Sequence, residues 1–188
     1  MISSCMILSN MLENIYSTDS ALTDAIVALM PRNAITDSLF LFLSLSGLTV
    51  FIWLILLIFM ILWEEKRHKE FIIYFLLAFI TTSFLVNILI KNIVKRDRPY
   101  VVKRLAVTAC PQDFSFPSGH AAGAFTGAVV FACFDKKRRY LYFTIATLIA
   151  FSRIYLHCHY LSDVVFGALI GYGVGKTFLL SISDRKRI

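Results

Sequence analysis

The sequence predicts an all-α fold, a polytopic membrane bundle of about five transmembrane helices preceded by an N-terminal interfacial helix. Of the 188 residues 58% are hydrophobic and only 16% are charged, whereas charged residues make up about 25% of an ordinary soluble domain. The hydrophobic residues also form long uninterrupted runs, as membrane spans do. We therefore expect a single integral membrane domain over residues 1–188, with an interfacial segment at 1–34 and a helical core at 35–182.

The first 34 residues differ from the rest because they contain no long hydrophobic run. A helix over residues 20–30, ended by Pro31, would have one apolar face. Asp24 argues against a crossing, so we expect this helix to lie in the membrane interface. The lack of a basic start also argues against a cleavable signal sequence. The expected apolar face consists of Leu22, Ile26, Val27 and Met30.

Five hydrophobic runs form the expected core. The first, residues 38–63, contains no charged residue. It is longer than the roughly 20 residues that cross a bilayer, which predicts a long or tilted span. The second run, 71–90, ends at Lys91, and the third, 119–134, is rich in small residues. The fourth and fifth cover residues 140–156 and 163–182.

Basic residues are divided unequally between the two sides that five crossings define. Ten lie in residues 64–70, residues 135–139 and the tail, whereas seven lie at Arg32 and in residues 91–117. Several of those seven belong to the motifs described below, so the positive-inside rule predicts a cytoplasmic C-terminus and an extracytoplasmic face for the motifs. We expect a bacterial inner or plasma membrane. The net charge of +7 then reflects topology and anionic headgroups, with no nucleic acid as partner.

Two of the expected spans carry a glycine at every fourth residue. Such stripes let helix backbones approach closely in lipid. We hypothesise that they pack the third and fifth spans together and so bring His120 close to His159. The alternatives are that each stripe packs against a different neighbour, or that one forms a dimer interface; the oligomeric state stays open. The stripes are Gly119, Gly123 and Gly127, and Gly167, Gly171 and Gly175.

The cysteines show no metal-ligand spacing. Cys110 and Cys158 should lie on the same side of the membrane, so a disulfide could join them, but we favour two unpaired thiols. The other two cysteines are Cys5 and Cys133.

Polar residues stand at the ends of three hydrophobic runs, where they are costly and therefore mark a candidate functional site. Lys91, Arg98 and Arg153 offer three cations, and the planar fork of arginine suits phosphate. Gly119 and its neighbour can offer backbone N–H groups at a helix start, where the helix dipole favours an anion. Ser118 adds a hydroxyl group. We expect the nearby Lys95, Arg96, Lys103 and Arg104 to be headgroup-facing or loop charges.

A neutral histidine can attack phosphorus directly and form a covalent phosphohistidine. Asp163 follows His159 by four residues, so both share one face of a helix that begins early, and the carboxylate would fix the ring tautomer. His120 would protonate the leaving oxygen as general acid. His157 is the alternative nucleophile, but its spacing fits the surrounding motif less well. The plainer alternatives are structural histidines and an Asp163 that only caps a helix.

Three motifs together carry a family resemblance. They read Lys91-x6-Arg98-Pro99, Pro117-Ser118-Gly119-His120 and Ser152-Arg153-x5-His159-x3-Asp163. In this order and spacing they resemble the signature of the type 2 phosphatidic acid phosphatase superfamily, over residues 35–180.

This resemblance implies a nucleophilic His159 supported by Asp163, with His120 as general acid, and no metal or other cofactor. It also implies a site at the outer membrane face. Many members have six spans, and many carry proline where this chain has Leu161. The implied phosphate-binding residues are Lys91, Arg98, Ser118, Gly119 and Arg153.

The expected function is therefore that of a membrane phosphatase that removes a terminal phosphate from a lipid phosphate or diphosphate. Undecaprenyl diphosphate is the first choice of substrate. Phosphatidylglycerol phosphate, phosphatidic acid and lipid A phosphates are alternatives, as is phosphotransfer to an acceptor other than water. The alternative of another class is a non-catalytic lipid-binding or transport protein in the membrane.

Overall fold

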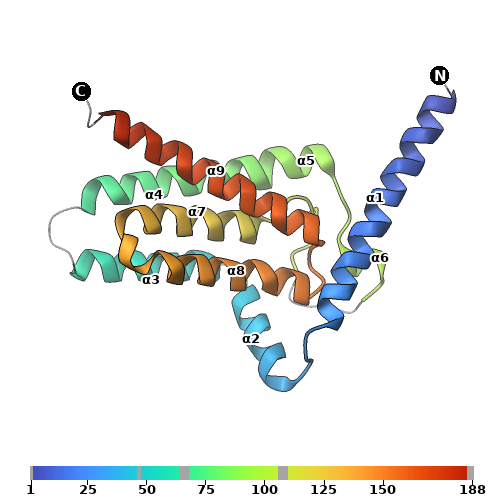
Figure 1. Ribbon diagram of the computed structural model, residues 1–188, viewed down its shortest axis with the longest axis horizontal. Coiled ribbons are helices and arrows are strands. Elements are labelled where there is room, and N and C mark those ends of the chain that lie inside the picture. The colour runs from blue at the N-terminus through green and yellow to red at the C-terminus, as the bar shows by residue number, and fades with distance from the viewer. Residues whose placement is uncertain (1, 46–47, 64–67, 106–109, 186–188) are drawn as a thin grey trace.

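The computed structural model describes residues 2–45, 48–63, 68–105 and 110–185, and every regular element in these ranges is helical (Figure 1). The predicted all-α fold is therefore confirmed. The long helices are α1 (Ile2–Ala28), α2 (Ala34–Ser44), α3 (Leu48–Trp63), α4 (His68–Ser83), α7 (Gly119–Phe134), α8 (Arg139–Tyr155) and α9 (Leu161–Arg185). The short elements are the π-helical segment η1 (Phe84–Ile90), α5 (Lys91–Val94), α6 (Pro99–Val102) and the 3₁₀ turn η2 (Lys136–Arg138).

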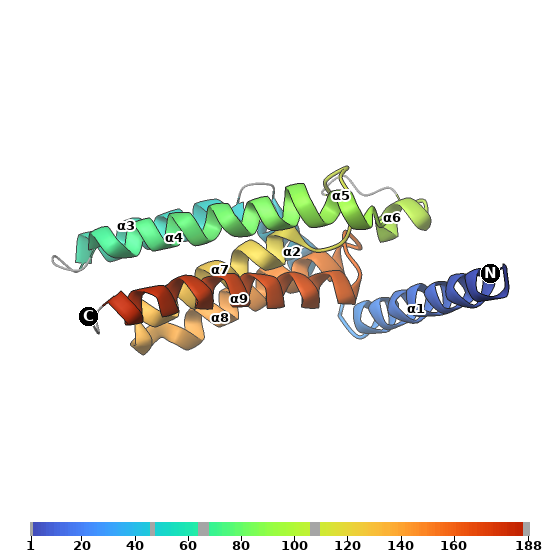
Figure 2. The ribbon, with the colours of Figure 1, turned by 90° about the horizontal axis from the view of Figure 1, so that it is seen from above.

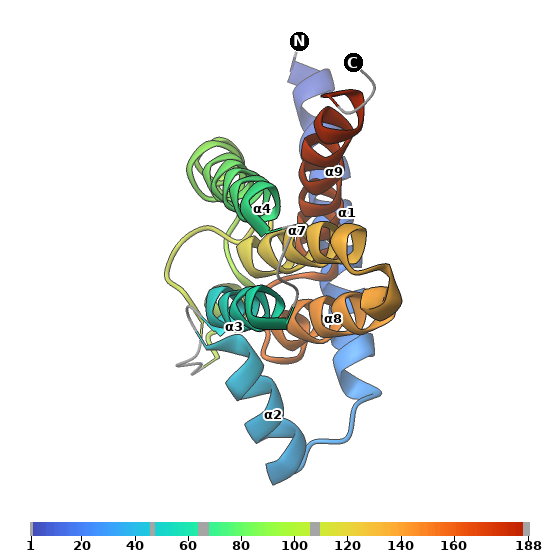
Figure 3. The ribbon, with the colours of Figure 1, turned by 90° about the vertical axis from the view of Figure 1, so that its left-hand side faces the viewer.

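Helix α7 lies at the centre of the bundle. Viewed along the bundle, α3 and α4 lie on one side of it and α8 and α9 on the other (Figure 3). Figure 2 shows the same arrangement as two layers, with α1 extending beyond the bundle. The sequence of α7 suits this position, because its buried residues are mostly alanine and glycine and neighbouring helices can approach closely.

The glycine stripe of α9 packs directly against α7, as the hypothesis predicted. A Cβ atom at Gly167 would lie 2.5 Å from the carbonyl oxygen of Ser118, and one at Gly171 would lie 2.1 Å from that of Ala122. Thr126 of α7 also donates to the carbonyl of Gly171 at 3.1 Å. No side chain larger than hydrogen fits these two α9 positions without moving the backbone of α7.

The glycine stripe of α7 faces a different direction, so that half of the hypothesis is wrong. Gly123 contacts Phe79 of α4, and Gly127 lies under the indole ring of Trp53 of α3. The α7 stripe thus receives large side chains from the other layer, while Ala122 of α7 meets Gly171 of α9. Because successive residues of a helix point in different directions, the small residues of α7 serve both neighbours.

The run over residues 38–63, predicted as one long or tilted span, is not a single straight helix. The axes of α2 and of residues 49–58 differ by 75°. The helix leaves its regular conformation at Leu45, and Arg153 donates to the carbonyl oxygen of Ser44 at 2.9 Å. That carbonyl is therefore bound by a side chain from α8 instead of by the next helical turn.

Two helical stretches, Phe71–Val102 and Leu161–Leu180, are long and apolar enough to cross a membrane, and the bent pair α2 and α3 could supply a third. Helix α7 is a shorter apolar helix, and α8 runs antiparallel to it (Figure 1). The count of five crossings stays a prediction.

Helix α1 begins much earlier than predicted, and its inward face combines polar and apolar residues. Val27 of the predicted apolar face is buried and Ile26 packs beside it, but Leu22 is 51% exposed, and Asp19 and Thr23 are buried instead. Thr23 accepts a hydrogen bond from the backbone N–H of Leu161 at 2.9 Å, and Asp19 accepts one from Ser162 at 3.1 Å. The first N–H groups of a helix have no partner within it. Here α1 supplies those partners to α9.

Candidate active site

Residues from all three motifs meet at the end of the bundle where α7 begins. They surround a cavity of about 210 Å³ that continues between α3, α4 and α7 as far as Thr49 and Phe79. The predicted residues that line this cavity are Lys91, Arg98, Gly119, His120 and His159. The remaining predicted residues, Ser118, Arg153 and Asp163, are completely buried beside or behind it.

The π-helical segment η1 brings Lys91 to the cavity. The N–H of Lys91 donates to the carbonyl of Val86, five residues earlier, as in a π-helix. Single π turns are frequent at functional sites because they shift the direction of the residues that follow. Helix α5 then ends at Lys95, whose φ of 51° lies in the left-handed region, and the chain turns back toward Arg98.

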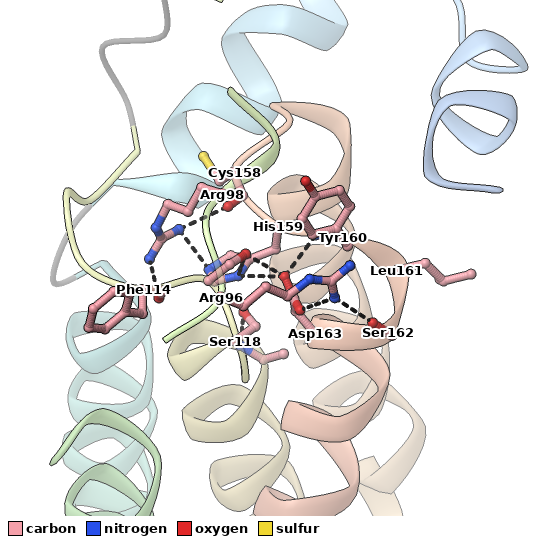
Figure 4. A network of polar contacts seen from close by, with 12 residues as sticks. Arg96, Arg98, Phe114, Ser118, Cys158, His159, Tyr160, Leu161, Ser162 and Asp163 are labelled. Carbon is pink, nitrogen blue, oxygen red and sulfur yellow. Dashed lines mark hydrogen bonds and ion pairs between the residues drawn. The ribbon is translucent and has the colours of Figure 1, made fainter. Parts of the chain in front are cut away.

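Arg98 connects the cavity to the loop that carries the histidine (Figure 4). Its guanidinium donates to the carbonyl of Cys158 at 2.9 Å and contacts Nε2 of His159 at 3.0 Å. Arginine cannot accept a hydrogen bond, so Nε2 of His159 carries a lone pair in this contact. The proton of the neutral ring is then on Nδ1.

The Nδ1 side of His159 faces a hydroxyl group and a carboxylate. Ser115 Oγ lies 3.4 Å from Nδ1, and Asp163 Oδ2 lies 3.5 Å from it. Burial, followed by the charges of Arg98, Arg153 and Lys91, holds the pKa of His159 well below its ordinary value. His159 is therefore neutral at physiological pH, with an unprotonated nitrogen directed at the cations.

Asp163 makes more contacts than the sequence predicted. Its Oδ2 accepts hydrogen bonds from Ser115 Oγ and from the backbone N–H of Tyr160, the latter at 2.9 Å. The predicted helix-capping contact is thus present together with the contact to His159. Its Oδ1 accepts from Arg96 Nη1 at 2.7 Å.

Arg96 is a residue of the site that sequence reasoning missed, and its interpretation as a headgroup-facing or loop charge is wrong. It is buried between Asp163 and Asp19 of α1, with both N···O distances at 2.7 Å. Its guanidinium also stacks 3.8 Å above the ring of Tyr160. The spacing of one residue between Arg96 and Arg98 was the available signal, because residues i and i+2 of an extended segment face the same side.

Arg153 approaches the site from α8 with unused hydrogen-bonding capacity. Its Nη1 donates to the carbonyl of Ser44, while Nε and Nη2 are buried without a hydrogen-bond partner in the described part of the chain. A buried, unpartnered guanidinium N–H costs free energy unless a ligand accepts its hydrogen bond. An anion in the cavity is the partner that this geometry suits.

Ser118 and Gly119 form the start of α7. Ser118 Oγ accepts from the N–H of Ala121 at 3.4 Å, and the Ser118 N–H donates to the carbonyl of Asp163 at 2.9 Å. The turn is thereby fixed against the beginning of α9. Gly119 and His120 line the cavity, so the positive end of the helix dipole lies beside it.

Asp113 is the second missed residue. Its carboxylate forms ion pairs with Lys91 Nζ and with Arg98 Nη2, the latter at 2.5 Å. Burial raises the pKa of this carboxyl, but Lys91 and Arg98 together hold it below its ordinary value. The available signal was that Asp113 is the one acidic residue between Pro111 and His120.

The prediction of two unpaired thiols is wrong, because Cys110 and Cys158 form a disulfide. It joins the segment that carries Asp113 to the residue just before His159. His157 is directed away from this site, with Nδ1 lying 3.8 Å from Asp24 Oδ1 of α1. Lys103 also pairs with Asp24, so it is bound to α1.

Known proteins with similar sequences act on lipid phosphates. The chain is 31% identical over 145 residues to undecaprenyl-diphosphatase of Sulfolobus acidocaldarius, covering 73% of this chain and 66% of that protein. It is 27% identical to undecaprenyl-diphosphatase BcrC of Bacillus subtilis, covering 82% and 79%. The chain thus spans about two thirds or more of the length of these relatives.

Two solved structures share the fold. One is a transmembrane PAP2 type phosphatidylglycerolphosphate phosphatase from Bacillus subtilis, with a TM-score of 0.69, 27% identity and coverage of 92% of this chain and 87% of that one. The other is LpxE of Aquifex aeolicus, with a TM-score of 0.63, 30% identity and coverage of 85% and 93%.

A family model provides an independent comparison. The PAP2 superfamily model matches residues 71–187, the region that contains all three motifs. The relatives and this match indicate a hydrolase of the membrane lipid phosphatase class. The three motifs, the fold and the family match agree, and the chain belongs to the PAP2 superfamily.

Proposed function

We propose that the protein hydrolyses the terminal phosphate of a lipid phosphate or diphosphate through a phosphohistidine on His159. The observation that carries this proposal is the unprotonated Nε2 of His159, which contacts the Arg98 guanidinium at the wall of a cavity that Lys91 also lines. Arg153 adds N–H groups that have no other partner in the described chain. A nucleophile and several cations at one cavity suit phosphoryl transfer.

In the proposed mechanism the terminal phosphoryl group binds to these cations and to the N-terminus of α7. Nε2 of His159 attacks phosphorus as the bond to the leaving oxygen breaks, and His120 donates a proton to that oxygen. Water then attacks the phosphohistidine, with His120 accepting a proton from it, and inorganic phosphate leaves. Asp163 and Ser115 hold the Nδ1 side of the ring throughout and stabilise the positive charge that develops there.

We propose undecaprenyl diphosphate as the first substrate to test. Two relatives named undecaprenyl-diphosphatase support this choice. The structural neighbours point to other headgroups, because one is named as a phosphatidylglycerolphosphate phosphatase, and a further relative is named as a lipid A 4′-phosphatase. Phosphatidic acid and transfer of the phosphoryl group to another acceptor complete the set of alternatives.

The test is phosphate release by the purified protein in detergent with EDTA present, using undecaprenyl diphosphate, phosphatidylglycerol phosphate and phosphatidic acid. We expect release by the wild type and none by His159→Ala. His157→Ala is the matched control, because that ring faces α1, and it should retain activity. Equal release by wild type and His159→Ala would remove His159 from the mechanism. Loss of activity in EDTA would contradict the metal-independent chemistry that the family resemblance implies.

We further propose that the site lies at the extracytoplasmic face. The disulfide beside it supports this orientation, because disulfides persist in oxidising compartments and are rare in the cytosol. Free, exposed Cys133 lies at the opposite end of α7 from His120 and provides an internal control. The double variant Cys5→Ser/Cys158→Ser leaves Cys110 and Cys133 as free thiols. In cells that produce this variant, a membrane-impermeant maleimide should label Cys110 while the cells are intact and Cys133 only after permeabilisation. The reverse pattern would overturn the orientation.

A further inference from the structure

The cations proposed to bind phosphate already hold an anion of the protein itself. Both oxygens of the Asp113 carboxylate are engaged, one by Lys91 and the other by Arg98. The side chains of these two cations are only 5% and 2% exposed, whereas that of Asp113 is 47% exposed. Two buried cations thus share one carboxylate that can reach solvent.

The backbone of this segment is fixed independently of the carboxylate. The carbonyl of Asp113 accepts from Arg98 Nε at 2.6 Å, and the carbonyl of Pro111 accepts from the Tyr100 hydroxyl at 3.0 Å. On either side, the Cys110 disulfide and a 2.7 Å hydrogen bond from the Ser115 N–H to Arg96 hold the chain in place. Rotation of the Asp113 side chain alone would therefore release Lys91 Nζ and Arg98 Nη2 from the carboxylate while the backbone stays in place.

We propose that Asp113 is an internal competitor for phosphate, which binds Lys91 and Arg98 in the empty site, gives way to the phosphoryl group of the substrate, and returns as inorganic phosphate leaves. This inference rests on the proposed function, because it needs the phosphoryl group to bind the same cations. Asp113 is ionised at neutral pH, so protonation does not relieve the competition.

The competition has a chemical purpose. Hydrolysis leaves inorganic phosphate beside several buried cations, where water screens the attraction poorly and an anion is bound tightly. A carboxylate that can replace it lowers the free-energy cost of release, in the way that any competing ligand does. A lipid substrate, in contrast, is concentrated in the bilayer and retains its apolar contacts, so it tolerates a weaker headgroup interaction. Asp113 would therefore favour the release of soluble phosphate and the entry of lipid-bound phosphate.

The test is the affinity of inorganic phosphate for the purified protein in phosphate-free detergent, measured by isothermal titration calorimetry and as inhibition of turnover. Asp113→Asn keeps the shape of the side chain and removes its charge. We expect it to bind phosphate about tenfold more tightly, since removing a like charge next to a bound anion is favourable, and to show a correspondingly lower inhibition constant. Asp113→Glu should stay near the wild type.

Asp97→Asn is the matched control, because Asp97 is an exposed acid of the same connection and does not pair with Lys91 or Arg98 in the structure. It should leave phosphate affinity unchanged. Unchanged or weaker phosphate binding by Asp113→Asn would overturn the competitor role, as would an equal gain in Asp97→Asn. Asp113→Ala serves as the second variant should Asp113→Asn not fold. Absence of phosphate binding in the wild type and in every variant would instead overturn the proposed phosphate site, and the competitor with it.

Discussion

Two carboxylates of the site differ in how they are held. Asp163 is completely buried, and it is bound by Arg96, Ser115 and a backbone N–H. None of these three partners lines the cavity. Asp113 is nearly half exposed, and its partners are the cavity cations themselves. The comparison teaches that one site can combine a fixed ion pair that orients a nucleophile with an exchangeable one that a ligand can replace.

The largest expected effect comes from neutralising the fixed carboxylate. Asp163→Asn should lower kcat by about 10³- to 10⁴-fold, because neutralising the carboxylate that holds the catalytic histidine of a serine protease lowers kcat by about 10⁴-fold. The measurement is steady-state phosphate release, with Asp113→Asn as the paired variant. Asp113→Asn should change phosphate inhibition far more than it changes the chemical step. A comparable loss of kcat in both variants would remove the distinction between the two carboxylates.

Arg96 provides the next test of the fixed pair. Arg96→Ala leaves the buried Asp163 without its cation, and removal of one partner of a buried ion pair costs about 3–5 kcal/mol. We expect a clear fall in thermal stability and a loss of about 10²-fold in kcat, with KM little changed. Arg96→Lys should recover part of the activity. If KM rises while kcat stays constant, Arg96 contacts the substrate and does not position Asp163.

The close packing of α9 against α7 predicts a smaller effect, on the stability of the protein. Gly171→Ala would place a methyl group against the backbone of α7 near Ala122, whereas nothing lies within 4 Å of a Cβ atom at Gly173. We expect Gly171→Ala to destabilise the protein by about 1–3 kcal/mol, as overpacking does, and Gly173→Ala to have little effect. Thermal unfolding in the same detergent compares them. Equal stability of the two variants would contradict the close approach of α7 and α9.

The pH dependence predicts the smallest change. His159 acts in its neutral form, and its lowered pKa means that it stays neutral when the pH falls through 6.5, the ordinary value for histidine. In the bell-shaped profile expected for two histidines, the acid limb should therefore lie well below pH 6.5. A profile of kcat/KM against pH for the free enzyme measures this limb. An acid limb centred at or above pH 6.5 would show that the ring is not buried among cations in the way described.

The sequence predicted the parts of the site that are encoded locally. Each motif is a short continuous segment at the end of an apolar helix. Because these helix ends lie on the same side of the bundle, the order of the motifs along the chain predicted that Lys91, Arg98, His120 and His159 would meet. The stripe of α9 likewise predicted its close approach to α7, since glycine spacing along a helix is visible in one sequence.

The missed features depend on contacts between distant parts of the chain. Asp19 and Arg96 are 77 residues apart, and neither shows a pattern that identifies the other. Helix α2 ends at Ser44, whose carbonyl is bound by Arg153, 109 residues later in the chain. Asp113 lies in an irregular segment without periodicity, so its direction toward the cations could not be derived from spacing.

The most direct test of the account is to trap the phosphoryl group on the protein. The purified protein would be mixed with a lipid diphosphate labelled in its terminal phosphate, quenched rapidly in alkali, in which phosphohistidine survives, and analysed by peptide mass spectrometry. The account predicts label on His159 in the wild type and in Asp113→Asn, and none in His159→Ala. Label on another residue, or label retained in His159→Ala, would contradict it.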